Sequence, residues 1–268
     1  MNPLSGVDSA RAETGQPGRT AVIAGSGGER ALPGYRQETV DTPYGQALVF
    51  RATEEDPIFL SRHGPEHDLP PHRINYRANI SALRLLGVDR VLATFTVGSL
   101  VEEVAPGDVV LPDQVLDFSS GRAATFFEGG EAGVEHAEFT EPFCSSLRAA
   151  LVRAAGAGGL AVRPAATYVC TNGPRLETAA EVRMYAMLGG DVVGMTAMPE
   201  VVLAREAGLH YAGIAVSVNW AAGLRGSVVL DRVAIDSVRS TLVPLMLAAL
   251  REVPAGECSC ARSVDQRG

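Results

Sequence analysis

Cysteine, tryptophan and long apolar runs are scarce or absent in this chain. Its 268 residues include four cysteines and one tryptophan. The cysteines, Cys144, Cys170, Cys258 and Cys260, are too few and too unevenly spaced for the disulfide framework of a small secreted protein, so reduced thiols are expected. No apolar run reaches the roughly 18 residues of a membrane span, and the N-terminal segment lacks the apolar core of a signal peptide. These absences predict a cytoplasmic protein without a membrane partner.

Positive charge is also in short supply. The 23 Lys and Arg residues are outnumbered by 31 Asp and Glu residues, which gives a formal charge of −8 and a pI near 5.2. That balance disfavours the broad basic surface of a protein that binds duplex DNA, so nucleic acid is not expected as a partner. A local group of arginines could still hold one anionic ligand.

Two common signatures of cofactor and metal sites are missing. The apolar run TAVIAG predicts a first strand, but the GSGGER turn after it lacks the GxGxxG fingerprint, which disfavours a dinucleotide-binding oxidoreductase. In SRHGPEHDLPPHR, Gly and Pro keep His63 and His67 from lying one turn apart on a helix. Neither HExxH nor paired cysteine spacing occurs, so no metal site is predicted.

The same His-rich segment fits an anion site better. Arg62 offers a planar guanidinium, His63 can donate a hydrogen bond, and Ser26 and glycine amides could join from the first turn. Phosphate is the natural ligand for such a group. The alternative is that Arg62 simply pairs with an acid at the surface.

Strand and helix patterns alternate along most of the chain. They predict one α/β domain over residues 20–253, a disordered leader over residues 1–19 and a polar tail over residues 254–268. Residues 119–138 form a long, Gly-rich connection that looks mobile, and connections of that length are often functional.

Two apolar runs that end on polar residues flank a helical pattern in the last third of the chain. DVVGMT and YAGIAVSV read as strands, and PEVVLAREAGL reads as the helix between them. Because the carboxyl ends of adjacent strands face one crevice in an open α/β sheet, Met195, Thr196 and Asn219 are candidates for one small-molecule pocket. An ordinary strand–helix–strand unit in which Asn219 caps a turn would leave the same pattern.

Glu177 stands at another junction between a strand and a helix, in TNGPRLETAAE. An acid at a helix N-terminus commonly stabilises the helix dipole, so this position alone does not indicate a site. The position of Glu177 indicates a functional site only when it is considered together with the other candidate residues.

These segments together resemble the trimeric family of purine nucleoside phosphorylases and methylthioadenosine phosphorylases. The matching text is, in order, GSG, VDTPYG, RHG, NYRAN, VGSL, PGD, EPFC, GPRLETAAE, VVGMTAMPEVVLARE and SVNWAAG. Within the family, the bacterial S-methyl-5′-thioinosine phosphorylases are most similar. The resemblance implies a single α/β domain with a central twisted mixed β-sheet flanked by helices, and a homotrimer with active sites near subunit boundaries.

The resemblance also implies a reaction. It is phosphorolysis of an N-glycosidic bond, which gives a free purine and a ribose 1-phosphate. Inorganic phosphate is the co-substrate and nucleophile, so no cofactor is expected.

Roles for individual residues follow from the same resemblance. It implies phosphate binding by Ser26, Arg62, His63 and Thr96. It implies catalytic roles for Asn219, Glu177 and His63. It implies substrate contacts for Met195, Thr196, Leu176, Glu177, Asn219, Tyr76, His136 reaching from a neighbouring subunit, and Val233.

The choice of base can be argued from hydrogen-bond donors and acceptors. A 6-oxopurine carries a proton on N1 and an acceptor at O6, so Glu177 can accept N1–H while the amide of Asn219 donates to O6 and accepts N7–H. Adenine inverts this pattern, a mismatch of about 1–3 kcal/mol per unsatisfied buried group. By resemblance, adenine-directed members carry an acid where Asn219 stands. The pair predicts a 6-oxopurine nucleoside.

The 5′ substituent of the sugar depends on the end of the chain. No histidine follows His210, and Val229, Leu230 and Val233 lie where the family forms its 5′ pocket. An apolar pocket favours a methylthio group over a hydroxyl, which predicts S-methyl-5′-thioinosine as substrate, with hypoxanthine and 5-methylthioribose 1-phosphate as products. Packing of the helix core explains the same residues equally well.

Three alternatives stay open. The chain could be an inosine or guanosine phosphorylase, or a methylthioadenosine phosphorylase. From a different class, it could be a nucleoside-binding protein without turnover, because the phosphate loop is altered and Phe95 stands near the expected phosphate.

Overall fold

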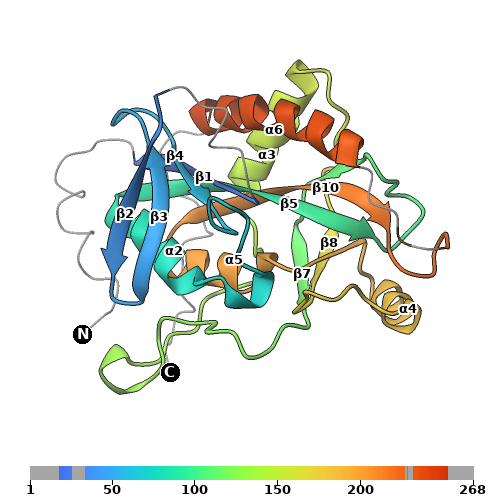
Figure 1. Ribbon diagram of the computed structural model, residues 1–268, viewed down its shortest axis with the longest axis horizontal. Helices are drawn as coiled ribbons and strands as arrows, with labels where there is room; N and C mark the ends of the chain where they lie inside the picture. The colour runs from blue at the N-terminus through green and yellow to red at the C-terminus, as the bar shows by residue number, and fades with distance from the viewer. Residues whose placement is uncertain (1–17, 26–33, 227, 229–231, 253–268) are drawn as a thin grey trace.

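One mixed β-sheet forms the centre of the molecule (Figure 1). The computed structural model describes residues 18–25, 34–226, 228 and 232–252, without the side chains of residues 232–240. Within this part, the sheet has the strand order β2-β3-β4-β1-β5-β9-β8-β7, and β10 lies against β5 and β6. The strands are β1 (Arg19–Ala24), β2 (Arg36–Thr42), β3 (Gly45–Arg51), β4 (Ile58–Ser61), β5 (Val88–Ser99), β6 (Val109–Val110), β7 (Gln114–Asp117), β8 (Thr167–Cys170), β9 (Val192–Gly194) and β10 (His210–Trp220).

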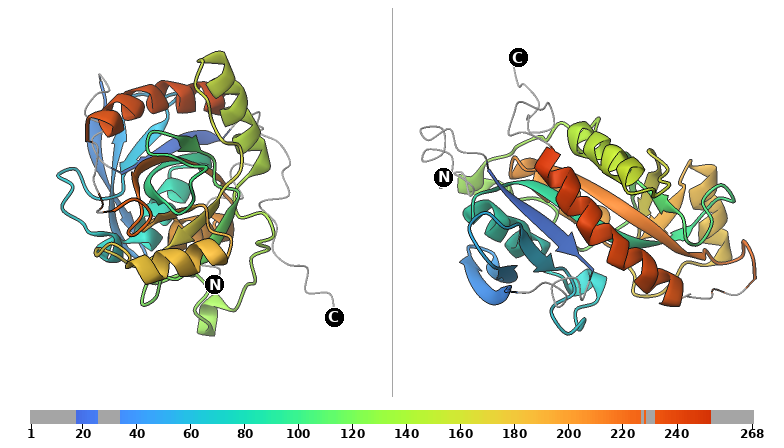
Figure 2. Two further views of the ribbon diagram at one scale, coloured as in Figure 1. Left: turned by 90° about the vertical axis from the view of Figure 1, so that its right-hand side faces the viewer. Right: turned by 90° about the horizontal axis from the view of Figure 1, so that it is seen from above.

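Helices cover both faces of the sheet. In Figure 1, α3 and α6 lie above it and α2 and α5 below, and the view from above shows α3 and α6 side by side on one face (Figure 2). Strands covered on both faces must be apolar on both faces, which explains why the run in β10 is buried almost throughout. The helices are α2 (Tyr76–Leu85), α3 (Ser145–Ala157), α4 (Ala179–Met187), α5 (Ala197–Glu206) and α6 (Arg232–Glu252), with short 3₁₀ turns η2 (Pro71–Arg73) and η3 (Gly130–Ala132).

The mixed character of the sheet comes from where the chain reverses. The pairs β1–β4, β1–β5 and β5–β10 in the middle of the sheet are parallel. The β2–β3 hairpin and the β5–β9 pair are antiparallel. The turn of that hairpin falls in the TPYG part of VDTPYG. The predicted α/β fold with a mixed sheet and flanking helices is therefore confirmed.

The connection over residues 119–138 is not free along its length, which corrects the expectation of a mobile segment. Thr125 Oγ1 and the Phe126 amide each donate to the Glu206 carboxylate at 2.7 Å. Arg77 forms an ion pair with Glu128 in the same stretch, again at 2.7 Å. These contacts fix the first half of the connection against α2 and α5.

The predicted leader and tail lie outside the described residues except for Gly18 and Arg19, and Arg19 opens β1 rather than ending the leader. No helix in the described part of the chain is long and apolar enough to cross a membrane.

Candidate active site

A cavity opens where β5 loses one of its neighbours. Strand β1 pairs with β5 as far as Ala93, and β9 joins the same edge only at Gly98. Among the described residues, no strand pairs with residues 94–97 along this edge, while β10 follows the other edge throughout. The gap leaves a cavity of about 480 Å³, within the range of roughly 300–1,000 Å³ that holds small ligands.

Five separate segments supply most of the cavity wall. Eight residues predicted from the sequence meet there: Arg62, His63, Thr96, Leu176, Glu177, Met195, Thr196 and Asn219. The prediction had assumed that the strands leading to Met195 and Asn219 are neighbours, but they are not. Strands β9 and β10 pair with opposite edges of β5, so their ends face each other across its carboxyl end.

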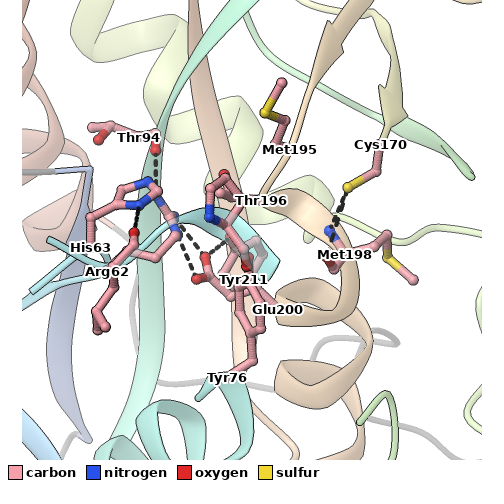
Figure 3. A network of polar contacts seen from close by, with 12 residues as sticks. Arg62, His63, Tyr76, Thr94, Cys170, Met195, Thr196, Met198, Glu200 and Tyr211 are labelled. Carbon is pink, nitrogen blue, oxygen red and sulfur yellow. Dashed lines mark hydrogen bonds and ion pairs between the residues drawn. The ribbon is translucent and has the colours of Figure 1, made fainter. Parts of the chain in front are cut away.

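Arg62 is held by a buried carboxylate at one end of the cavity (Figure 3). Its Nε and Nη2 donate to the two carboxylate oxygens of Glu200, each at 2.7 Å, and its Nη1 donates to the Thr94 carbonyl at 3.1 Å. Both side chains of the ion pair are 1% exposed. Burial opposes the charged form, but the charge and hydrogen bonds of Glu200 outweigh it and raise the pKa of Arg62.

The partner of Arg62 is thus a core acid and not the surface acid considered above. Tyr211 donates to the same carboxylate at 2.6 Å, so Glu200 is shared between two side chains. Each terminal nitrogen of Arg62 keeps a second hydrogen that these bonds do not use. The arginine can therefore still donate to an anion, from a position that Glu200 fixes.

His63 presents a lone pair to the cavity rather than a hydrogen. Its Nδ1 lies 2.7 Å from the carbonyl of Leu69 and must donate to it, because a carbonyl oxygen only accepts. Burial, together with the nearby charge of Arg62, lowers the pKa of His63 to about 4. At neutral pH the ring is uncharged and Nε2 is an acceptor, which corrects the expectation that His63 donates.

We expect this half-buried neutral histidine to make the fold sensitive to acid. A folded-state pKa of about 4 against an ordinary 6.5 means that the unfolded chain binds the proton more readily. The contribution of His63 is complete above the ordinary value and is lost as the pH falls from there towards 4. Urea unfolding of the protein and of His63→Gln at several pH values checks this. The variant should lose less stability on acidification, and equal losses would contradict the assignment.

Asn219 reaches the cavity because β10 bulges just before it. The register between β10 and β5 shifts between Ser217 and Asn219, so that Val218 and Asn219 both line the cavity. The Asn219 amide nitrogen donates to the Trp220 carbonyl at 2.9 Å, which fixes the orientation of the amide. Gly98 lies opposite, where a Cβ would come within 3.1 Å of that nitrogen. One amide hydrogen and Oδ1 stay available to a ligand.

Glu177 is oriented by the strand that precedes its loop. Thr171, at the end of β8, donates from Oγ1 to Glu177 Oε1 at 2.9 Å. The carboxylate is partly buried and lines the cavity beside Leu176, so its second oxygen can accept from a ligand. Helix α4 starts with a capping box made by Thr178 and Glu181. The helix is therefore capped by Glu181, and the Glu177 carboxylate is bound by Thr171 instead.

Met195 and Thr196 form the part of the wall between these two ends. Gly173 packs directly against the Met195 side chain, and a Cβ there would come within 2.3 Å of its Sδ. Thr196 is buried, and its amide lies 3.4 Å from the Tyr168 hydroxyl. Figure 3 shows Met195 and Thr196 beside the network of Arg62 and Glu200.

Four other predicted residues are not part of this wall as described. Tyr76 is buried behind it and donates to the Pro71 carbonyl at 3.1 Å, so it does not line the cavity. His136 is exposed on the 119–138 connection, and this chain does not bring it to its own cavity. Ser26 and the side chain of Val233 lie outside the described residues.

Sequence reasoning missed Glu200 and undervalued Phe95. Glu200 lies in PEVVLAREAGL, which was predicted only as a helix, and its side chain is fully buried. Phe95 covers one face of Arg62, with the guanidinium carbon 5.2 Å from the ring centroid, and packs edge-on against Tyr168. The available signal for Glu200 was a charged residue on a helix whose other positions are almost all apolar, because such a charge requires a partner. Within the described residues, no three His, Cys, Asp or Glu side chains converge as a metal site would require.

Comparison with known proteins identifies a family and individual relatives within it. The sequence matches the family described as Phosphorylase superfamily over residues 19–243. A 6-oxopurine nucleoside phosphorylase from Pyrococcus furiosus is 46% identical over 254 residues, which cover 90% of this chain and 96% of that protein. A probable S-methyl-5′-thioinosine phosphorylase from Methanopyrus kandleri is 44% identical over 251 residues, which cover 91% and 96%.

Solved structures with the same fold include enzymes named for a different purine. Methylthioadenosine phosphorylase from Schistosoma mansoni in complex with tubercidin matches with a TM-score of 0.77 and 32% identity, over 87% of this chain and 91% of that chain. The fold is thus shared by proteins named for 6-oxopurine nucleosides and by a protein named for an adenine nucleoside. Side chains in the cavity, and not the fold, must select the base.

Proposed function

The chain belongs to the phosphorylase superfamily, and from this premise we propose that it cleaves 6-oxopurine nucleosides with phosphate. The family expected from the sequence is confirmed by the comparisons, and relatives carry both names that the resemblance implied. The observation that carries the proposal is the pairing of Glu177 with Asn219 in one cavity. A carboxylate that accepts N1–H and an amide that donates to O6 match a 6-oxopurine and oppose adenine.

In the proposed reaction, one end of the cavity binds phosphate and the other binds the purine base. Arg62 can hold phosphate through its unused hydrogens, and the lone pair of His63 Nε2 can accept a hydrogen from a phosphate that retains one. Thr96, on the unpaired edge of β5, lies in the same wall. Phosphate is then the nucleophile at C1′ of a sugar resting against Met195. No protein side chain needs to form a covalent intermediate.

Charge on the departing base is stabilised at the opposite end. The glycosidic bond breaks through a cation-like sugar and an electron-rich purine, so a fixed donor at the base lowers the barrier. The second hydrogen of the Asn219 amide is held for this by the Trp220 carbonyl. The free oxygen of Glu177, which Thr171 orients, accepts N1–H and positions the base. The mechanism requires no cofactor, and inorganic phosphate is the co-substrate.

For the sugar, we propose a 5′-methylthio group in preference to a hydroxyl. Leu242 and Val216 add apolar surface to the cavity, alongside Leu69. A hydroxyl buried without a partner costs about 1–3 kcal/mol, whereas a thioether does not need a partner. S-methyl-5′-thioinosine is therefore the proposed substrate, and inosine and guanosine are the competing ones.

A panel of substrates with and without phosphate tests these proposals. Release of free purine should require phosphate, and methylthioinosine should be cleaved with a higher kcat/KM than inosine, guanosine or methylthioadenosine. Preference for methylthioadenosine would overturn the assignment of the base, and preference for inosine would overturn only that of the 5′ group. Binding of nucleoside without any phosphate-dependent release would favour the protein without turnover.

We also propose a homotrimer that acts in the cytoplasm. Met184 and Met187 of α4 and Leu188 at its C-cap are 37%, 81% and 55% exposed, and such a group of exposed apolar side chains is typical of an interaction surface. His136 and Val134 are exposed on the 119–138 connection, where a neighbouring subunit could receive them. Light scattering should give the mass of three 28.1 kDa chains. A monomer at micromolar concentration would contradict the proposal.

A further inference from the structure

Arg122 lies outside the cavity wall but connects the two loops that form much of it. It belongs to the 119–138 connection, is partly buried, and forms no ion pair within the described part of the chain. Its Nη1 donates to the carbonyls of Met195, at 2.9 Å, and of Met198. Its Nη2 donates to the carbonyls of Thr171 and Asn172, at 3.3 and 3.0 Å. One side chain therefore binds backbone from two separate loops.

These carbonyls face Arg122 where the chain leaves regular structure. Thr171 and Asn172 follow the last residue of β8, and Met195 follows the last residue of β9. Met198 has the non-helical angles φ −108° and ψ 136° inside the first turn of α5. Buried carbonyls at such breaks need donors from elsewhere. A guanidinium can supply several in one plane, which a lysine ammonium cannot.

Both loops carry side chains of the candidate active site. Thr171 orients Glu177 through its hydroxyl, and the Met195 side chain lines the cavity against Gly173. Ser120, two residues before Arg122, adds a second tie, because its amide donates to Asn172 Oδ1 at 3.1 Å and its hydroxyl accepts from Asn172 Nδ2 at 3.1 Å. The 119–138 connection is thus joined at two points, Ser120 and Arg122, to the loop after β8 that leads to Glu177.

We propose that Arg122 is a positioning residue that sets the separation between Glu177 and Met195, and with it the alignment of the nucleoside. This inference rests on the proposed function and adds to it a residue that touches neither substrate. Arg62, which holds the phosphate end, is bound directly by Glu200 and the Thr94 carbonyl, two groups that are not among the acceptors of Arg122. Loss of Arg122 should therefore impair the binding and alignment of the nucleoside more than the binding of phosphate.

Steady-state kinetics of Arg122→Lys and Arg122→Ala test the proposal on the full-length protein. Arg122→Lys keeps the charge and loses the planar fork, so kcat/KM for methylthioinosine should fall about 10-fold to 100-fold, since a displacement of about 1 Å can cost that much. The KM for phosphate should change by less than about twofold, because the phosphate end is fixed separately. Arg153→Lys, at an exposed arginine of α3, is the matched control and should leave both parameters unchanged.

Chemical rescue separates positioning from simple loss of folding. Guanidinium at low millimolar concentration should restore part of the activity of Arg122→Ala and none to Arg122→Lys, whose side chain still fills the site. An unchanged kcat/KM in Arg122→Lys, or an equal rise in the KM for phosphate, would overturn the inference. If Arg122→Ala does not fold, Arg122→Lys with an unchanged melting temperature decides alone. An inactive wild-type protein would instead overturn the proposed function.

Discussion

Replacement of Glu200 with alanine is expected to lower the free energy of unfolding by about 3–5 kcal/mol, the usual cost of leaving a buried charge without its partner. Arg62 and Glu200 are each 1% exposed, so no solvent can replace the lost carboxylate. The Tyr211 hydroxyl loses its acceptor at the same time. Phosphate-dependent activity should fall strongly as well, because the guanidinium then loses two of its three hydrogen bonds and keeps only the one to the Thr94 carbonyl.

Urea unfolding measures the stability part of this prediction. Glu252→Ala is the matched control, since it removes a carboxylate from Arg153 in an ion pair that is 58% and 43% exposed. Such a surface pair contributes no more than about 1 kcal/mol. A loss in Glu200→Ala as small as that in the control would contradict the prediction.

A triple variant separates stability from function at this site. Arg62→Met, Glu200→Leu and Tyr211→Phe together remove every member of the network and leave no buried charge. Replacing a whole buried network by apolar residues is often neutral or stabilising, so this variant should regain most of the stability lost in Glu200→Ala. It should remain inactive, because the phosphate end has lost the guanidinium that follows β4.

The sequence was sufficient for the fold because local patterns and the final structure agree. The apolar run in β10 is buried almost throughout, and the segment PEVVLAREAGL, predicted as a helix, contributes most of α5. The cavity was also foreseen, but for a reason that was only partly right. Met195 and Asn219 line one cavity because β9 runs antiparallel to β5 and brings Met195 back beside the unpaired edge at residues 94–97, while Asn219 enters from β10 on the other edge. The order and direction of strands in a sheet are not written in any local pattern.

The contacts that hold the site together were not predictable in the same way. Arg62 and Glu200 are 138 positions apart, and Arg122 reaches carbonyls 49 to 76 positions away. A carbonyl carries no residue-specific signal, and four of the five acceptors of Arg122 are carbonyls, the fifth being the Tyr76 hydroxyl. Such a side chain cannot be recognised from composition or spacing. The tautomer of His63 likewise depends on the carbonyl of Leu69, which comes near only when the loop after β4 has folded.

Asn219→Asp is expected to lower kcat/KM for inosine and methylthioinosine by about 100-fold to 1,000-fold, the effect typical of losing one donor that stabilises developing charge. The amide hydrogen that would face O6 is replaced by an oxygen, and a carboxylate beside an electron-rich purine opposes its departure. The structure adds a second cost. Asn219 Nδ2 lies 2.9 Å from the Trp220 carbonyl, so an aspartate in this orientation would place two acceptors against each other.

The loss should be smaller for adenosine and methylthioadenosine, because their 6-amino group can donate to the new carboxylate. The ratio of kcat/KM for the 6-oxopurine nucleoside to that for its 6-amino counterpart should therefore fall by at least about tenfold, because a buried polar mismatch discriminates strongly.

Asn75→Asp is the matched control for this change, because Asn75 Nδ2 also donates to a backbone carbonyl, that of Tyr44, at 2.7 Å. Asn75 caps α2 outside the cavity, and aspartate is an equally good cap. The control should therefore retain both activity and preference. An unchanged ratio in Asn219→Asp would show that Glu177 alone reads the base. A comparable loss in Asn75→Asp would trace the effect to the backbone contact and not to the purine.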